Sequence, residues 1–163
     1  MTNVYKFTRF WQIAGITSCF GLSIGILLPL FLVDKDSSFY SVFSWLSAIM
    51  FIVSLVFTFE ATTGKIVTSP SGIEWFTIGT RVQIPWDMVE RIDSRGFGYL
   101  SLVFKGAIYK NSLGKSILHL LGSDNKIELT SYVRDPRTSK LISDIMQYAP
   151  SIKSHGFGYT KNS

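Results

Sequence analysis

Two long stretches without charged residues dominate the hydrophobic pattern of this chain. They run from Phe10 to Val33 and from Ser37 to Phe59, and a charged break of three residues, 34–36, separates them. A helix needs roughly 20 apolar residues to cross the hydrocarbon core of a bilayer, which is about 30 Å thick. The pattern therefore predicts a transmembrane helical hairpin, with a leader at residues 1–9 and spans at residues 10–33 and 37–59.

Beyond this hairpin the pattern changes to short strands divided by turn residues. Strands are expected at residues 65–68, 73–78, 81–84, 90–94, 99–105, 116–121 and 126–130, because each run is apolar or alternating and is bounded by Gly, Pro, Asn, Asp or Ser. The segment Gly122-Ser123-Asp124-Asn125 reads as the loop of the last hairpin. These strands predict a seven-stranded antiparallel, partly open barrel.

One amphipathic helix is expected to close this domain. Asp135 suits the N-cap, Pro136 the first helical position, and apolar residues then recur at helical spacing until Pro150. The domain is thus placed at residues 64–150, and the polar tail at 151–163 is expected to be flexible unless a partner orders it. The fold class predicted is a membrane-anchored α+β protein.

Part of this domain resembles a known family. The segments Ser71-Gly72-Ile73-Glu74 and Arg81-Val82-Gln83-Ile84-Pro85-Trp86-Asp87-Met88-Val89-Glu90-Arg91-Ile92 look like those of bacterial pleckstrin-homology-like (PH-like) domains. The resemblance covers about residues 64–150 and implies a PH-like fold with a binding or scaffolding role. It carries no catalytic residue and no defined ligand. The basic loop of phosphoinositide-binding relatives is not matched, because the first turn is Ser69-Pro70-Ser71-Gly72.

Charge near the apolar stretches predicts the orientation of the hairpin. Lys6 and Arg9 precede the first stretch without any acid, whereas the break between the stretches holds Lys35 between two aspartates. Short basic segments stay on the cytoplasmic side, so both termini are expected in the cytoplasm of a multi-pass protein of the plasma (inner) membrane. The alternative of a cleaved signal peptide is disfavoured, because the first stretch exceeds the usual hydrophobic region of about 7 to 15 residues.

Small residues mark a candidate helix-packing face in the first stretch. Gly21 and Gly25 form a GxxxG motif, and Ala14 and Ser18 precede it at near-helical spacing. Such residues let helix backbones approach closely in lipid. The favoured interpretation is that the hairpin packs against itself through this face, and the alternative is a homo-oligomer or a larger partner. Neither stretch contains an ionisable residue of the kind that ion pathways need, which favours an anchor over a transporter.

Residues that could support catalysis are few and scattered. Asp87, Glu90 and Asp93 lie close together but alternate with arginines, which favours a solvated, charge-balanced turn over an acid–base pair. Two histidines, His119 and His155, and the single Cys19 do not make a zinc site of the usual ligand count. The sequence therefore predicts no catalytic residue, no metal and no cofactor, and a protein that is not an enzyme.

A segment rich in basic residues is the remaining candidate site. Its basic residues are candidates for contact with anionic lipid headgroups or with a protein partner. They are Arg91, Arg95, Lys105, Lys110, Lys115 and Lys126. Scattered solubilising charge on alternate strand positions explains the same residues equally well. Nucleic-acid binding is disfavoured, because aromatic residues are not interleaved with these cations. The function expected is protein–protein interaction or scaffolding of a membrane assembly, with anionic-lipid sensing as the alternative.

Overall fold

The chain divides into two compact units. The computed structural model describes residues 2–32, 35–77, 79–95, 99–123, 125–136, 138–150 and 152–155. One unit is the helical segment Arg9–Thr63, and the other combines Met1–Thr8 with Gly64–Ser163. The second unit is therefore built from chain segments on both sides of the first.

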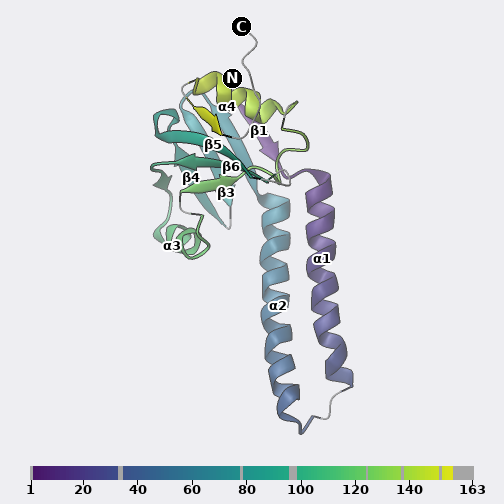
Figure 1. Cartoon of the computed structure of the whole chain (residues 1–163). Helices are drawn as coiled ribbons and strands as arrows, with labels where there is room; N and C mark the ends of the chain where they lie inside the picture. The colour runs from purple at the N-terminus through teal and green to yellow at the C-terminus, as the bar shows by residue number, and fades with distance from the viewer. Residues whose placement is uncertain are drawn as a thin grey trace. The chain divides into compact units, whose positions relative to one another are not determined.

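The helical unit is a pair of long helices, α1 and α2, that run side by side (Figure 1). Helix α1 spans Arg9–Leu27 and continues as a short 3-10 helix, η1, at Leu28–Phe31, while α2 spans Ser38–Thr63. Both are long and apolar enough to cross a membrane. Helix α1 ends before the expected Val33, because Pro29 lacks the N–H that an α-helix would use there.

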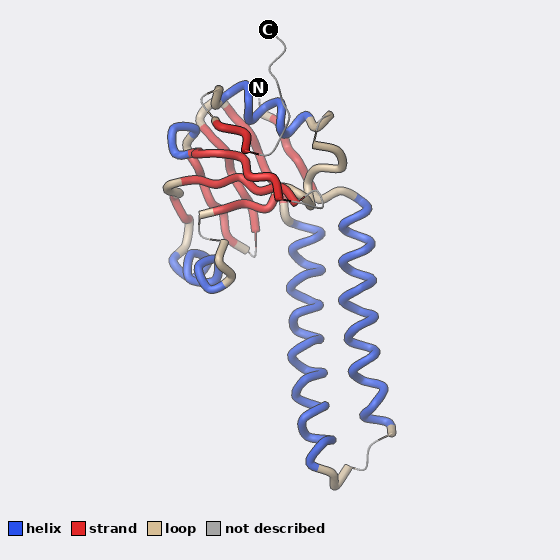
Figure 2. Tube along the Cα trace, viewed as in Figure 1, coloured by secondary structure: helices blue, strands red, loops and turns tan. Residues whose placement is uncertain are grey.

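The other unit is α+β. Figure 2 shows its strands in red, with helices in blue around them. The elements along the chain are β1 (Asn3–Lys6), β2 (Lys65–Ser69), β3 (Gly72–Thr77), β4 (Thr80–Ile84), η2 (Trp86–Met88), β5 (Val89–Arg95), β6 (Tyr99–Phe104), β7 (Ile108–Tyr109), α3 (Ser112–Leu120), β8 (Lys126–Glu128), α4 (Lys140–Tyr148) and β9 (Lys153–His155). The described strands form a five-stranded sheet, β1-β2-β3-β4-β7, and a four-stranded sheet, β8-β6-β5-β9.

Every pairing in these sheets is antiparallel except that of β9, which runs parallel to β5. The expected α+β class with antiparallel sheets is confirmed. The described strands form two sheets and not one closed barrel, and their number differs from the seven expected. The additional strands are β1, β7 and β9, each of only two to four residues.

Two elements near the C-terminus differ from the prediction. Of residues 116–121, expected as a strand, 116–120 belong to α3 and Leu121 is its C-cap. The helix begins after an N-cap at Asn111, whose side chain accepts a hydrogen bond from the Gly114 amide. The last helix begins at Lys140 after Ser139, so the Asp135 cap was placed too early. Part of the tail expected to be flexible, residues 153–155, forms β9.

The core lies where the inner faces of the two sheets meet α4 and α3. Its residues alternate along the strands, as the register requires. The largest fully buried side chains are Ile66, Ile73, Val82, Ile84, Ile92, Leu100, Leu102, Leu118, Ile127, Leu129, Leu141 and Ile145. Gly72 opens β3 with a positive φ of 147°, and a Cβ there would collide with the Ile84 carbonyl. Only glycine fits that corner.

Candidate functional site

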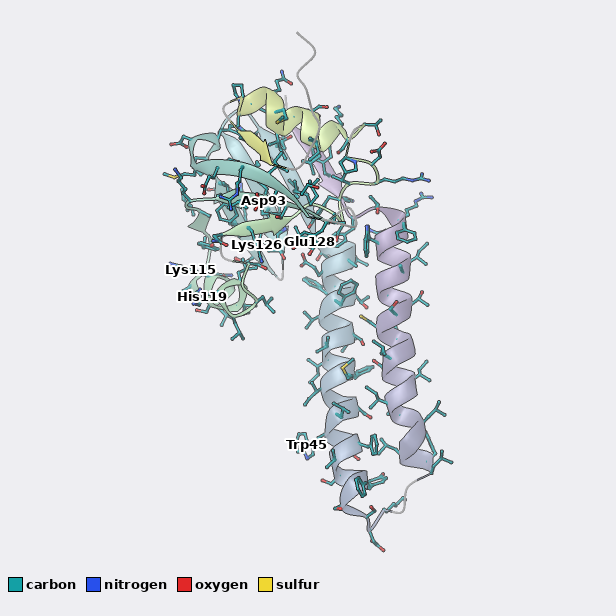
Figure 3. All side chains as sticks on the ribbon, in the orientation of Figure 1. Trp45, Asp93, Lys115, His119, Lys126 and Glu128 are labelled. Carbon is teal, nitrogen blue, oxygen red and sulfur yellow. The ribbon has the colours of Figure 1, made fainter. Side chains whose placement is uncertain are left out.

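The helical unit carries an exposed apolar surface along its length. Leu22 and Ile24 on α1 are 57% and 58% exposed, and Ile52 on α2 is 59% exposed. Trp45, which Figure 3 shows projecting outward from α2, is 71% exposed. Monomeric soluble proteins rarely expose continuous apolar patches larger than a few hundred Å². Nothing in the described unit covers this surface, so it requires an apolar environment or a partner.

Serine hydroxyls join the two helices on their inner side. The Ser54 hydroxyl donates to the Cys19 carbonyl at 3.1 Å, and the hydroxyls of Ser54 and Ser23 are 2.8 Å apart. Ser47 donates to the Ile26 carbonyl at 3.3 Å, nearer the turn between the helices. Each of the three serines is less than a tenth exposed. Interhelical hydrogen bonds of this kind hold helices together where no hydrophobic drive exists.

At the opposite end of the pair, a glutamine makes the corresponding contact. The Gln12 side-chain amide donates to the Ala61 carbonyl at 3.0 Å. Gln12 was not singled out from the sequence, although a lone amide in an apolar stretch is a signal for such a bond. Hydrogen bonds therefore join the helices at three separate levels.

The helices do not pack through the GxxxG face. Gly21 and Gly25 have nothing within 4 Å of the place where a Cβ would stand, and Ser18 is exposed, with Ala14 half-buried. The close approach is at Gly15, where a Cβ would collide with the Phe57 ring. The favoured interpretation of Gly21 and Gly25 as the self-packing face of the hairpin is therefore wrong. Their role toward another partner stays a prediction.

In the sheet unit, the strand that precedes the helices pairs with the strand that follows them. Antiparallel β1 and β2 match Asn3 with Thr68 and Lys6 with Lys65. The Thr8 amide donates to the Ser131 carbonyl at 2.9 Å, and the Phe7 ring lies 4.6 Å from that of Tyr132. Residues 3–8 of the expected leader are thus integrated into the domain, whereas Arg9 begins α1.

A buried carboxylate fixes this leader strand. Asp144 on α4 is 6% exposed. Its Oδ2 accepts hydrogen bonds from Tyr5 Oη at 2.5 Å, Asn3 Nδ2 at 2.7 Å and Thr68 Oγ1 at 2.9 Å. Burial alone would raise the pKa of Asp144, but the bonds from Tyr5, Asn3 and Thr68 outweigh it and lower the pKa. We call these four residues the Asp144 cluster.

The pKa of the phenol in this cluster is shifted in the opposite direction. Burial and the hydrogen bond to the carboxylate of Asp144 raise the pKa of Tyr5 well above its usual range, so Tyr5 stays a proton donor. The cluster was not predicted from the sequence. Its signal was an aspartate on the otherwise apolar side of the last helix, between Leu141 and Ile145.

The six basic candidates come from several different elements of the sheet domain. Arg91 pairs with Asp93 at 2.7 Å and with Glu90 at 3.1 Å, which raises its pKa. Lys126 lies on β8, two residues from Glu128, and Figure 3 labels both. The side chain of Arg95 lies outside the described residues. Lys105, Lys110 and Lys115 are all exposed, and the role of the six basic residues in lipid or partner contact stays a prediction.

Exposed leucines lie on helix α3 and at its C-cap, close in sequence to two of these lysines. Leu113, Leu120 and Leu121 are exposed by 71%, 86% and 58%. Together with half-buried Ile117 they recur at positions i, i+4, i+7 and i+8. We call these four residues the α3 stripe. The stripe was missed because the run 116–121 was interpreted with a strand period.

Two adjoining grooves lie on the outer face of β3, β4 and β7. One, of about 310 Å³, is lined by Arg81, Gln83, Ile108 and Lys110. The other, of about 190 Å³, shares Gln83 and Ile108 and extends to the corner at Ser71 and Gly72. Glu74 accepts from Arg81 and from Gln83 Nε2 at 3.1 Å. Ile108 is exposed, so the floor of these grooves combines an apolar side chain with two cations.

Two of the three acidic candidates for chemistry lie around one arginine in the described residues. Glu90 and Asp93 are both engaged by Arg91, which agrees with a charge-balanced group, and Asp87 is exposed on η2. Within the described residues, no group of three or more His, Cys, Asp or Glu side chains could hold a metal ion. His119 lies on α3, whereas the His155 side chain is outside what the structure describes.

Comparison of the chain with models of protein families, with curated proteins and with solved structures finds no match. Its function is therefore argued from its own residues.

Proposed function

We propose that this chain is a non-enzymatic integral membrane protein, in which α1 and α2 cross the plasma membrane and the sheet domain binds a protein partner at the cytoplasmic face. The observation that carries the proposal is the pairing of β1 with β2 across the helical segment. Residues 3–6 and 65–68 share one sheet, so both ends of Arg9–Thr63 leave from the same body.

This pairing limits how the helices can cross a bilayer. A segment whose two ends join one sheet crosses the membrane an even number of times, and two helices provide two crossings. The exposed apolar surface of these helices supports the crossing. The pairing also argues against a cleaved signal peptide, because cleavage after α1 would remove β1 from its partner strand.

The charges near the helix ends support the cytoplasmic orientation. Lys6 and Arg9 stand on the domain side, and the connection between the helices has only Lys35 beside acidic residues. The aromatic pair Phe10 and Trp11, with ring centroids 5.7 Å apart, lies at the same end of α1. Such aromatics suit the interface between membrane and water.

A PH-like fold with a scaffolding role is part of the proposal. Consecutive antiparallel strands, two packed sheets and a terminal helix with a buried apolar face are compatible with that family. The two grooves along β3, β4 and β7 provide the binding face, because Ile108 supplies exposed apolar area beside Arg81 and Lys110. A protein partner, or a second copy of this chain, would contact this face.

Cysteine labelling tests the crossing and the orientation. In a Cys19→Ala background, single cysteines replace Lys35 between the helices and Ser71 at the domain corner, both of which are exposed. A membrane-impermeant maleimide should label Lys35→Cys in intact cells and Ser71→Cys only after permeabilisation. The reverse pattern would overturn the orientation, and equal labelling of both from outside would overturn the crossing.

Photo-crosslinking in native membranes tests the binding face. A photoreactive residue at Gln83, in both grooves, should give an adduct of defined mass, whereas one at exposed Gln147 on α4 should not. An adduct of twice the chain mass would identify a second copy as the partner. Recovery of the uncrosslinked chain alone from both positions would refute the binding role.

A further inference from the structure

We propose that α3 is a second membrane contact, a short amphipathic helix whose α3 stripe enters the outer part of an anionic leaflet. The inference rests on the proposed anchoring function and adds a lipid-binding element in the sheet domain. It begins from α3, which Figure 1 labels. Leu113, Ile117 and Leu120 share one side of this helix, Leu121 follows at the C-cap, and the three leucines are exposed.

The apolar side of α3 is wider than its contact with the core requires. Leu118 is 1% exposed, and Gly114 lies so close to Thr80 that a Cβ would collide with it. These two residues hold the helix against the domain. The α3 stripe lies beside them on the helix circumference, and its three leucines are exposed rather than packed on the core. Packing within the domain therefore does not explain why the stripe is apolar.

Charge identifies the kind of surface that covers the stripe. The segment 99–123, which contains α3, has three lysines and no acidic residue. Lys110 directly precedes the N-cap Asn111, and Lys115 lies on α3 with its Nζ 5.9 Å from the Tyr109 ring centroid. Lys110 lies three residues before Leu113 and Lys115 two residues after it, so the cations adjoin the N-terminal end of the stripe, whereas Leu120 and Leu121 lie at the other end of a helix about 14 Å long. Leucines with nearby lysines are typical of helices that lie in an anionic membrane interface.

The size of the stripe favours a bilayer over a protein partner. A stable protein–protein interface buries about 800 Å² on each partner, which four aliphatic side chains on a nine-residue helix do not provide. A domain joined to its anchor by Phe7–Thr8 and Gly64 is already held at the bilayer. At such a high effective concentration, a weak contact is enough to be populated.

Depth-sensitive fluorescence on the full chain in nanodiscs tests this contact. In the Cys19→Ala background, an environment-sensitive dye is attached at Leu120→Cys on the stripe, at Gln147→Cys on α4 as the matched control, and at Leu22→Cys on α1. The discs contain phosphatidylcholine with or without phosphatidylglycerol. In the anionic discs, the dye at 120 should shift to shorter wavelength and lose most of its emission to brominated lipid tails, while the dye at 147 should not.

The three positions separate failure of the inference from failure of the anchor. Quenching at 22 without quenching at 120 would overturn the α3 contact and leave the anchor in place. Absence of quenching at 22 would overturn the proposed anchoring itself. A shift at 120 that needs no lipid and grows with protein concentration would mean that a second copy covers the stripe, which also overturns the inference.

A charge-reversal variant tests the electrostatic part. Lys110→Glu with Lys115→Glu should reduce the quenching at 120 in anionic discs and bring it to the level seen in neutral discs. Unchanged quenching would show that lipid charge has no part in the contact. Gln147→Glu, on the other helix, serves as the matched charge control and should change nothing.

Discussion

Replacing Asp144 by asparagine should loosen the leader strand while leaving the rest of the sheet domain folded. The carboxylate accepts three hydrogen bonds at 2.5–2.9 Å, two of them from β1. A hydrogen bond to a charged group contributes about 1.5–3 kcal/mol, and a neutral one about 0.5–1.5 kcal/mol. An amide oxygen can accept the same bonds without charge, at about 1–1.5 kcal/mol less for each bond, so the expected loss is roughly 3–4 kcal/mol for the three together.

The pH dependence follows from the sign of the pKa shift. The pKa of Asp144 is lowered by folding, and an unfolded aspartate titrates near pH 3.9. Its stabilising contribution is therefore fully present above about pH 4 and is lost as the pH falls through the lower pKa of the folded state. The difference in stability between the original protein and Asp144→Asn should be constant near neutral pH and shrink in acid.

Two measurements check this reasoning on the full chain in nanodiscs. Urea unfolding followed by the fluorescence of buried Trp75 reports the stability of the domain. Amide hydrogen exchange at residues 2–8 reports the leader strand alone. Tyr5→Phe removes one of the three donors and should cost about 1.5–3 kcal/mol. In the Asp144→Asn background the same change should cost only about 0.5–1.5 kcal/mol, as for a neutral hydrogen bond. Equal unfolding midpoints at pH 7 for the original protein and Asp144→Asn would refute the role assigned to the carboxylate.

Two further predictions concern packing. Trp86 is half-buried and stacks on Tyr148 with ring centroids 5.3 Å apart, so Trp86→Ala should lower domain stability by roughly 2–4 kcal/mol; an unchanged urea midpoint would contradict this packing. In the helical unit, Gly15→Leu should separate the helices, because a side chain there collides with Phe57, whereas Gly21→Leu should be tolerated. Disulfide trapping or spin-label distances between α1 and α2 measure the helix separation in both variants. Equal separation in Gly15→Leu and Gly21→Leu would contradict packing of the helices through the Gly15 face.

The long-range pattern of the chain was predictable from sequence because it depends on the count and period of apolar residues. Two uncharged stretches gave two helices, and the alternation from Lys65 to Ile84 gave three strands within one or two residues of their observed bounds. The errors occurred where the apolar run was short. The six residues ending at Leu121 fit a strand as well as a helix. The helix signal, the N-cap at Asn111, lies five residues before that apolar run.

The elements that were missed depend on partners distant in sequence. Strand β1 has only four residues, and its pairing with β2 spans the whole helical segment. No local sequence pattern predicts such a pairing, because it is stabilised by backbone hydrogen bonds to β2 and by side-chain hydrogen bonds to Asp144, more than 130 positions away. The inner face of the helix pair was misplaced for a similar reason. Small residues recur on two sides of α1, and only the position of Phe57 on α2 distinguishes them.

The pairing of β1 with β2 also bears on biosynthesis. During translation β1 is made first, and its partner β2 follows only after both helices, so the sheet is completed only after the helical segment Arg9–Thr63 has been made. If the proposed anchor is correct, a chain in which only one of the two helices crossed the membrane would leave Asn3 and Tyr5 on the other side of the bilayer from Asp144. Asp144 would then be left in the domain without two of its donors, as an acid with poorly satisfied hydrogen bonds. Completion of this sheet would thus act as a checkpoint that distinguishes correctly inserted chains from misinserted ones.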